Sequence, residues 1–174
     1  MDSNKMNNNA VAFLGLCVEY CRTLEDTRNS TKKAFVDSMV RLLPRIYIAA
    51  NDLNLIADED NAYIENRLEE DYYESIRLGI ENLLGPDDTY LEVFEEDMKY
   101  SDTPIAASVS ENLADLFQVF YDCIEAVRDV PDDVVMGALA SVKEDFQSYW
   151  SRILCNVMRP LNSIKNNDTD IDDD

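Results

Sequence analysis

Apolar residues recur at intervals of three and four positions along most of this chain, which is the spacing of one face of an α-helix. The clearest stripe consists of Ile105, Val109, Leu113, Leu116, Phe120, Ile124 and Val127. Four other segments share the spacing. The pattern therefore predicts five long helices, at about 10–27, from Ser30 or Thr31 to about Ile56, at about 67–84, at about 104–129 and from Pro131 to about 165.

Residues that start, bend or stop helices agree with these limits. Ser30 or Thr31 is a good N-cap for the second helix. Pro44 lies inside it and predicts a kink or a break after about Val40, because proline removes one backbone hydrogen bond. Gly85 and Pro86 form a stop signal for the third helix. Pro160 is expected to bend or end the fifth helix.

The connections between these segments are short, which favours antiparallel neighbours in a bundle. Residues 87–98 fit either a short helix or an extended piece. We expect an all-α fold, a single-domain antiparallel bundle of five to six helices whose second helix is kinked at Pro44. The bundle should cover 10–165, after a flexible N-terminus at 1–9 and before a disordered acidic tail at 166–174.

Charge adds the next constraint. The chain has 36 acidic and 15 basic residues, a net charge of −21, and residues 51–127 alone have 21 acidic and 3 basic residues, a net −18. This charge repels phosphate backbones and anionic membranes, so we expect neither nucleic-acid nor membrane binding but a basic protein partner. Basic residues cluster in one segment of the chain: Arg22, Arg28, Lys32, Lys33, Arg41 and Arg45. This cluster could bind an anion, but we favour the interpretation that its positive charge offsets the negative charge of residues 51–127 within the same fold.

The chemistry of the side chains narrows the function further. The chain has no histidine, which removes histidine-based acid–base catalysis and histidine metal sites. Four cysteines lie in apolar helical patterns and are expected to be buried, reduced thiols: Cys17, Cys21, Cys123 and Cys155. Tyr149 and Trp150 are expected to pack in the core with the indole N–H near the surface. No targeting or membrane-spanning segment is found, which favours the cytoplasm, and no cofactor is expected.

The segment from Phe94 to Asp115 is the leading candidate for a site. Its carboxylates, hydroxyls and aromatic side chain could line one binding surface: Glu95, Glu96, Asp97, Tyr100, Ser101, Asp102, Ser108, Glu111 and Asp115. A second interpretation is helix capping. Asp102 or Thr103 would then cap a helix with Pro104 in its first turn, and Ser108 and Glu111 have the spacing of a capping box. The two interpretations are compatible.

Two functions remain open. The first hypothesis is a non-enzymatic binding or regulatory protein that presents its acidic surface to a basic partner; a homodimer is a further alternative. The second is a magnesium-dependent hydrolase of a phosphorylated small molecule. Glu92 and Glu95 match the first carboxylate pair of the all-helical nucleoside-triphosphate pyrophosphohydrolases, but Glu111 and Asp115 have the wrong spacing for the second pair. No catalytic or metal-binding residue is therefore assigned.

Four runs of residues resemble an uncharacterised family of acidic, all-helical bacterial proteins, common in anaerobic gut bacteria and known only as a domain of unknown function. They are L-x-x-I-Y-x-x-A at 43–50, D-Y-Y at 71–73, Y-L-E-V-F at 90–94 and Y-S-D-x-P-x-x-A-S-x-S-E-x-L-A-D at 100–115. The resemblance covers nearly the whole chain. It implies a helical domain and a bacterial cytoplasmic setting, and it implies no activity, ligand or catalytic residue.

Overall fold

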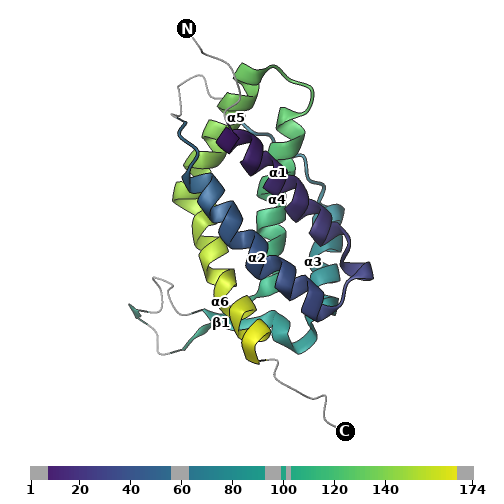
Figure 1. The fold of residues 1–174 in the computed structure, drawn as a ribbon. Helices are drawn as coiled ribbons and strands as arrows, with labels where there is room; N and C mark the ends of the chain where they lie inside the picture. The colour runs from purple at the N-terminus through teal and green to yellow at the C-terminus, as the bar shows by residue number, and fades with distance from the viewer. Residues whose placement is uncertain (1–7, 56–62, 93–98, 101–102, 168–174) are drawn as a thin grey trace.

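Six α-helices make up most of the part of the chain that the computed structural model describes, which is residues 8–55, 63–92, 99–100 and 103–167 (Figure 1). Their bounds are α1 (Asn8–Glu25), α2 (Lys32–Asn51), α3 (Glu70–Leu84), α4 (Val109–Val127), α5 (Asp132–Asp145) and α6 (Ser151–Asn167). A π-helical segment, η4 (Phe146–Trp150), joins α5 to α6 without a break. The predicted fifth helix is therefore one continuous helical segment from Asp132 to Asn167. The helices together confirm the predicted all-α bundle.

The shorter elements lie at the ends of the helices. A 3-10 turn, η1 (Thr27–Asn29), separates α1 from α2, and a second one, η2 (Gly85–Asp88), follows α3. The strands β1 (Thr89–Glu92) and β2 (Ile105–Ser108) pair antiparallel, with Thr89 opposite Ser108. This small hairpin lies near the end of the bundle where α6 ends (Figure 1).

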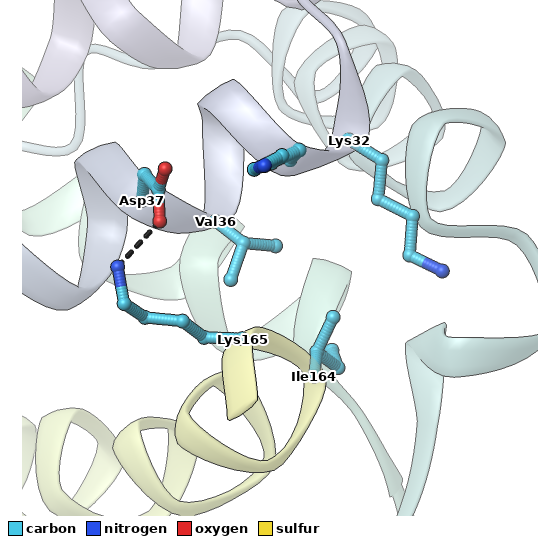
Figure 2. A pocket seen from close by; sticks show the side chains of 6 residues that line it. Lys32, Val36, Asp37, Ile164 and Lys165 are labelled. Atoms are coloured by element: carbon cyan, nitrogen blue, oxygen red, sulfur yellow. Dashed lines mark hydrogen bonds and ion pairs between the residues drawn. The ribbon is translucent and has the colours of Figure 1, made fainter. Parts of the chain in front are cut away.

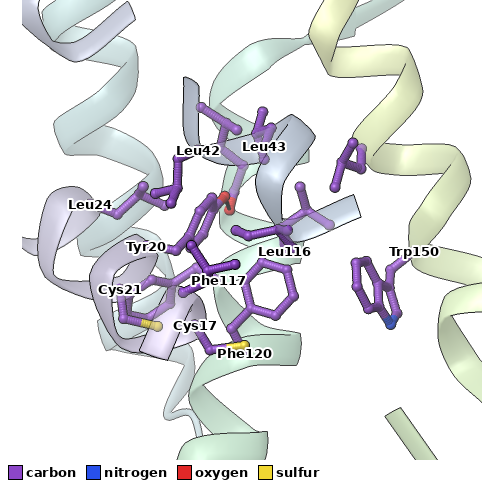
Figure 3. Packing of buried hydrophobic residues seen from close by; sticks show 14 of the residues in the cluster. Cys17, Tyr20, Cys21, Leu24, Leu42, Leu43, Leu116, Phe117, Phe120 and Trp150 are labelled. Atoms are coloured by element: carbon purple, nitrogen blue, oxygen red, sulfur yellow. Dashed lines mark hydrogen bonds between the residues drawn. The ribbon is translucent and has the colours of Figure 1, made fainter. Parts of the chain in front are cut away.

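Helix α4 lies at the centre of the bundle, where it contacts α1, α3, α5 and α6. Its Phe120 is fully buried and meets three aromatic rings edge to face, with centroid distances of 6.4 Å to Phe13, 5.0 Å to Tyr20 and 5.2 Å to Trp150. Figure 3 shows Tyr20, Phe120 and Trp150 together in this core. The Tyr20 hydroxyl remains satisfied because it donates a 2.7 Å hydrogen bond to the backbone carbonyl of Leu113.

The start of α4 corrects the predicted limits. The helix begins at Val109, not at about 104, and Ile105–Ser108 is a strand. The cause lies 22 residues away: the buried carboxylate of Asp88 accepts 2.7 Å hydrogen bonds from both the backbone N–H and the hydroxyl of Ser110. Ser108 acts as the N-cap and accepts a hydrogen bond from the Glu111 N–H at 3.2 Å, as its spacing predicted. Thr103 and Pro104 precede the strand, and Asp102 lies outside the described residues.

Prolines and glycines behave largely as predicted. Pro44 lies within α2, which continues to Asn51, so the predicted break is wrong. Proline has no backbone N–H to donate to the preceding turn, and the loss of that hydrogen bond favours a bend. Pro160 likewise lies inside α6 without ending it. Gly85 ends α3 with a φ of +58°, a conformation that a side chain would strain. Thr31 is the N-cap of α2, where its hydroxyl accepts from the Ala34 N–H at 3.2 Å.

Side chains at the two ends of the sequence correct several details. In α1 the apolar residue Val11 is 53% exposed, whereas Phe13 and Tyr20 are fully buried. Trp150 is buried with its indole N–H, which donates to the Val142 carbonyl at 3.1 Å, while Tyr149 is 45% exposed. The indole N–H is therefore not near the surface as predicted. The π-helical segment η4 has more residues per turn than an α-helix, which changes which residues face the core.

The predictions for the cysteines and for the two ends of the chain also need correction. Cys17, Cys21 and Cys123 are free, buried thiols, but Cys155 is exposed on α6. Residues 8–9 and 166–167, which were expected to belong to the N-terminal segment and the acidic tail, are helical; residues 1–7 and 168–174 lie outside the described part of the chain. Among the described residues, no helix combines the length and apolar character that crossing a membrane requires.

We expect Phe120→Ala to lower the free energy of unfolding by about 3–5 kcal/mol, because it opens a cavity where three aromatic rings meet. Urea denaturation followed by circular dichroism measures the change. Val11→Ala is the control and should change stability by about 0.5 kcal/mol or less, since Val11 is mainly exposed. Similar losses in the two variants would contradict this description of the core.

We also expect Asp88→Ala to lower the free energy of unfolding by about 2–3 kcal/mol, because it leaves the N–H and hydroxyl of Ser110 without their buried acceptor. The adjacent Asp87→Ala serves as the control. It removes only the exposed ion pair with Lys32, which contributes about 1 kcal/mol or less. Chemical denaturation of both variants tests whether Asp88 positions α4; equal losses would argue against it.

Candidate functional site

A cleft of about 280 Å³ lies beside α4 and contains three aspartates. One wall is α4, and the others come from the segment that precedes α3 and from α5 with η4. The lining residues are Ile64, Asn66, Asp115, Gln118, Val119, Asp122, Val142, Asp145 and Tyr149. We refer to this set as the acidic cleft. Its volume is just below the range of about 300–1,000 Å³ that is usual for small-molecule sites, so it fits a single side chain or a small amine.

Asp115 is half-buried in the cleft and accepts a 2.6 Å hydrogen bond from the hydroxyl of Tyr73 on α3. Desolvation raises the pKa of the Asp115 carboxyl above its ordinary value of 3.8. The hydrogen bond from Tyr73 lowers this pKa, and the negative charge of Glu111 one turn earlier raises it. The pKa of Tyr73 is raised as well, first by burial and then by its bond to the carboxylate. Asp115 is thus a carboxylate held in a poorly hydrated, negative environment.

Asp122 occupies the same face of α4 two turns later. It is only 5% exposed, and its Oδ1 accepts hydrogen bonds from the backbone N–H groups of Arg67 at 2.9 Å and Leu68 at 3.0 Å. Burial raises the pKa of Asp122 although these donors oppose the change. Asp122 therefore has a structural role, because it holds the backbone of the segment that leads into α3. It also adds negative charge to the cleft. Two helical turns correspond to about 10 Å between the Asp115 and Asp122 positions on the helix.

Asp145 and Tyr149 form the opposite side of the cleft. Asp145 is the last residue of α5, and partial burial raises the pKa of its carboxyl, with a smaller contribution from the charge of Glu144. Tyr149 comes from η4, and its pKa is raised by burial and then by the charge of Asp115. The three carboxyl groups of the cleft therefore share one property: each is harder to ionise than in water because it is partly removed from solvent.

No lysine or arginine forms an ion pair with an aspartate of this cleft within the part of the chain that the structure describes. None of the ion pairs found there includes Asp115, Asp122 or Asp145. Arg67 lowers the pKa of Asp122 by its charge, but the two residues form no ion pair. The nearby Lys143 instead donates to the carbonyls of Ala50 and Asn51, at 2.8 and 2.7 Å, where it caps the end of α2.

Only part of the predicted site coincides with this cleft. Asp115 lines it, and Glu111 lies one turn away at the exposed start of α4. Tyr100 is 92% exposed. The other predicted residues, Glu95, Glu96, Asp97, Ser101 and Asp102, lie outside the described residues. The capping interpretation is confirmed for Ser108 and does not account for Asp115.

Sequence reasoning missed Asp122, Asp145 and Tyr73. Asp122 had a signal, because it is seven residues after Asp115 and therefore shares its helix face. Asp145 and Tyr73 had none, since only the packing of α3 and α5 against α4 brings them near Asp115.

The magnesium alternative rested on Glu92, Glu95, Glu111 and Asp115. Glu92 lies on β1 and Glu111 and Asp115 on α4, while Glu95 is outside the described residues. Among described residues, no group of three or more His, Cys, Asp or Glu side chains is placed to hold one metal ion. The three aspartates of the cleft are likewise not a metal site of that kind.

Comparison with known proteins identifies the family. Residues 4–167 match the family described as a domain of unknown function, DUF5063. The chain belongs to this family. It is also similar to the crystal structure of protein BF1032 from Bacteroides fragilis, a structural genomics target. The two chains are 28% identical, the similarity covers 91% of this chain and 93% of that one, and the TM-score is 0.79. No curated protein matches the chain significantly.

Replacing Tyr73 with phenylalanine should raise the pKa of Asp115 further, because the hydroxyl that favours the ionised carboxylate is lost. This rise in the Asp115 pKa should be measurable, since a hydrogen bond to a charged group contributes about 1.5 kcal/mol or more. Carbon-detected NMR titration of the Asp115 carboxyl measures it directly. Tyr149→Phe is the control, because no Tyr149 hydrogen bond to Asp115 is found among the described residues; an unchanged pKa in Tyr73→Phe would refute the role of the bond.

The same pKa shift has a consequence for stability. The folded-state pKa of Asp115 lies above its ordinary 3.8, so the folded chain binds a proton more readily than the unfolded one. The contribution of this group is therefore present at low pH and is lost as the pH rises through the window above 3.8. Asp115→Asn should remove that part of the pH dependence, which urea denaturation at several pH values would show.

Proposed function

We propose that this member of the DUF5063 family is a non-enzymatic binding protein whose acidic cleft receives a basic side chain of a protein partner. The observation that carries the proposal is that three aspartates line one cleft, with Asp122 buried, Asp115 half-buried and Asp145 exposed, and that none of them forms an ion pair with a lysine or arginine of the described chain. Burying carboxylates without a counter-charge costs free energy. An ammonium or guanidinium group in the cleft would offset that cost.

The charge of the chain supports the same partner. Residues 51–127 have a net charge of −18 and include Asp115 and Asp122. A surface of this sign attracts a basic protein over a distance and speeds its association at low salt. Specificity would then come from the cleft, which Asp115 and Asp145 both line and whose volume of about 280 Å³ limits the size of the bound group.

The test uses a short acetylated peptide of four lysines as a probe and isothermal titration at low and moderate salt. Asp115→Asn and Asp145→Asn should each weaken binding by about tenfold, which corresponds to about 1.4 kcal/mol. Both substitutions keep the size of the side chain. Asp133→Asn removes the same charge from the exposed first turn of α5 and should change affinity by less than about twofold, since it acts only through long-range attraction.

Equal weakening in all three variants would show that the peptide responds to net charge alone, which would overturn the role of the cleft. Failure of the wild-type protein to bind at low salt would have the same consequence. Titration with magnesium and a nucleotide, under the same conditions, tests the hydrolase alternative; binding that depends on Glu111 and Asp115 would favour it.

A further inference from the structure

A second pocket, of about 260 Å³, lies between the first turn of α2 and the last turn of α6 and shares no lining residue with the acidic cleft. It is lined by Lys32, Lys33, Val36, Asp37, Ile164 and Lys165. Figure 2 shows Lys165 reaching from α6 to Asp37 on α2, with Val36 and Ile164 on the facing sides of the gap. We refer to these six residues as the lysine pocket.

The charge of this pocket is opposite to that of the protein. Three lysines and one aspartate line it, which leaves two positive charges in a chain whose net charge is −21. A hydrogen bond from Lys165 lowers the pKa of Asp37, and the charges of Arg41 and Lys33 act in the same direction. Lys165 was not part of the basic cluster recognised in the sequence; the packing of α6 against α2 adds it.

Offsetting the acidic middle of the chain does not account for all three lysines. Lys32 pairs with Asp87 and Lys165 pairs with Asp37, but both pairs are partly exposed to solvent, with side chains 31–45% exposed. Exposed pairs of this kind contribute little to stability. Lys33 takes part in no ion pair found among the described residues. An added anion would therefore compete with Asp87 for Lys32 and with Asp37 for Lys165, whereas it would meet Lys33 without displacing an ion pair found there.

The pocket also has an apolar floor. Val36 is 2% exposed and Ile164 is partly buried, and both belong to or pack against the main core. An ordinary inorganic anion would leave these side chains unused, whereas an organic group attached to the anion would cover them. The positive end of α2 and the negative end of α6 both lie at this pocket, so the helix dipoles oppose each other and the lysines supply the attraction for an anion.

From the three lysines, the size of this half-open pocket and its apolar lining, we propose that the lysine pocket binds a small organic phosphate monoester. The phosphate lies among the ammonium groups of Lys32, Lys33 and Lys165, each of which offers three donors. The organic group rests on Val36 and Ile164. Binding is reversible and involves no bond breakage.

Phenyl phosphate is a suitable probe, with inorganic phosphate and phenol as its two halves. In a two-dimensional NMR titration of the full chain, phenyl phosphate should cause saturable shifts at the backbone amides of Val36 and Ile164, with half-saturation at about 1–5 mM. Inorganic phosphate should bind more weakly at the same residues, and phenol should cause no saturable shift. Raising the salt concentration should weaken binding, because the contacts are ionic.

The decisive comparison is between Lys33→Gln and Arg22→Gln. Lys33 lines the pocket and Arg22 is exposed on α1, so each variant loses one surface charge and neither loses a core contact. Lys33→Gln should weaken phenyl phosphate binding at least fivefold, and Arg22→Gln should leave it within twofold. No saturable shift up to about 20 mM probe, equal affinity in the two variants, or shifts confined to other residues would each overturn the proposal.

Discussion

Helix α4 has apolar side chains on several faces, and the other helices are arranged to cover them. Phe117 and Phe120 are fully buried between α1, α3 and η4, and the neighbouring aromatic rings meet them edge to face or stacked. Because a helix with such a broad apolar surface must be covered on more than one side, α4 becomes the centre and the remaining helices pack around it. This constraint decides where polar groups on α4 are placed as well.

Three polar residues of α4 lie where the packing places them in buried or half-buried surroundings. Ser110 is fully buried and is held by Asp88, while Asp115 and Asp122 face the gaps between α4 and its neighbours. A carboxylate in such a gap is partly desolvated, which raises its pKa and makes a cationic ligand favourable. The acidic cleft is thus a direct result of placing two aspartates on a central helix. The lysine pocket has a different origin, because it forms where two helix ends meet at the surface.

Local signals were sufficient for much of the fold. The stop at Gly85, the cap at Thr31 and the cap at Ser108 depend on residues within one helical turn of each other, and all three are confirmed. Predictions failed where a distant group intervened. Asp88 shifts the start of α4, so that Ile105 pairs in a strand instead of joining the helical stripe. The π-helical segment η4 buries Trp150 and exposes Tyr149, and periodicity counted at a constant 3.6 residues per turn does not detect this change.

The sequence by itself determined that this protein is a helical bundle with a strongly acidic middle and no histidine chemistry, because periodicity, composition and capping act within a few residues. Tertiary structure alone decided which acids share a cleft and which lysines share a pocket. Asp145 and Tyr73 approach Asp115 only through helix packing, and Lys165 joins Lys33 from more than 130 positions away along the chain. The physical reason is that desolvation and charge proximity depend on distances in space, which the order of residues does not specify.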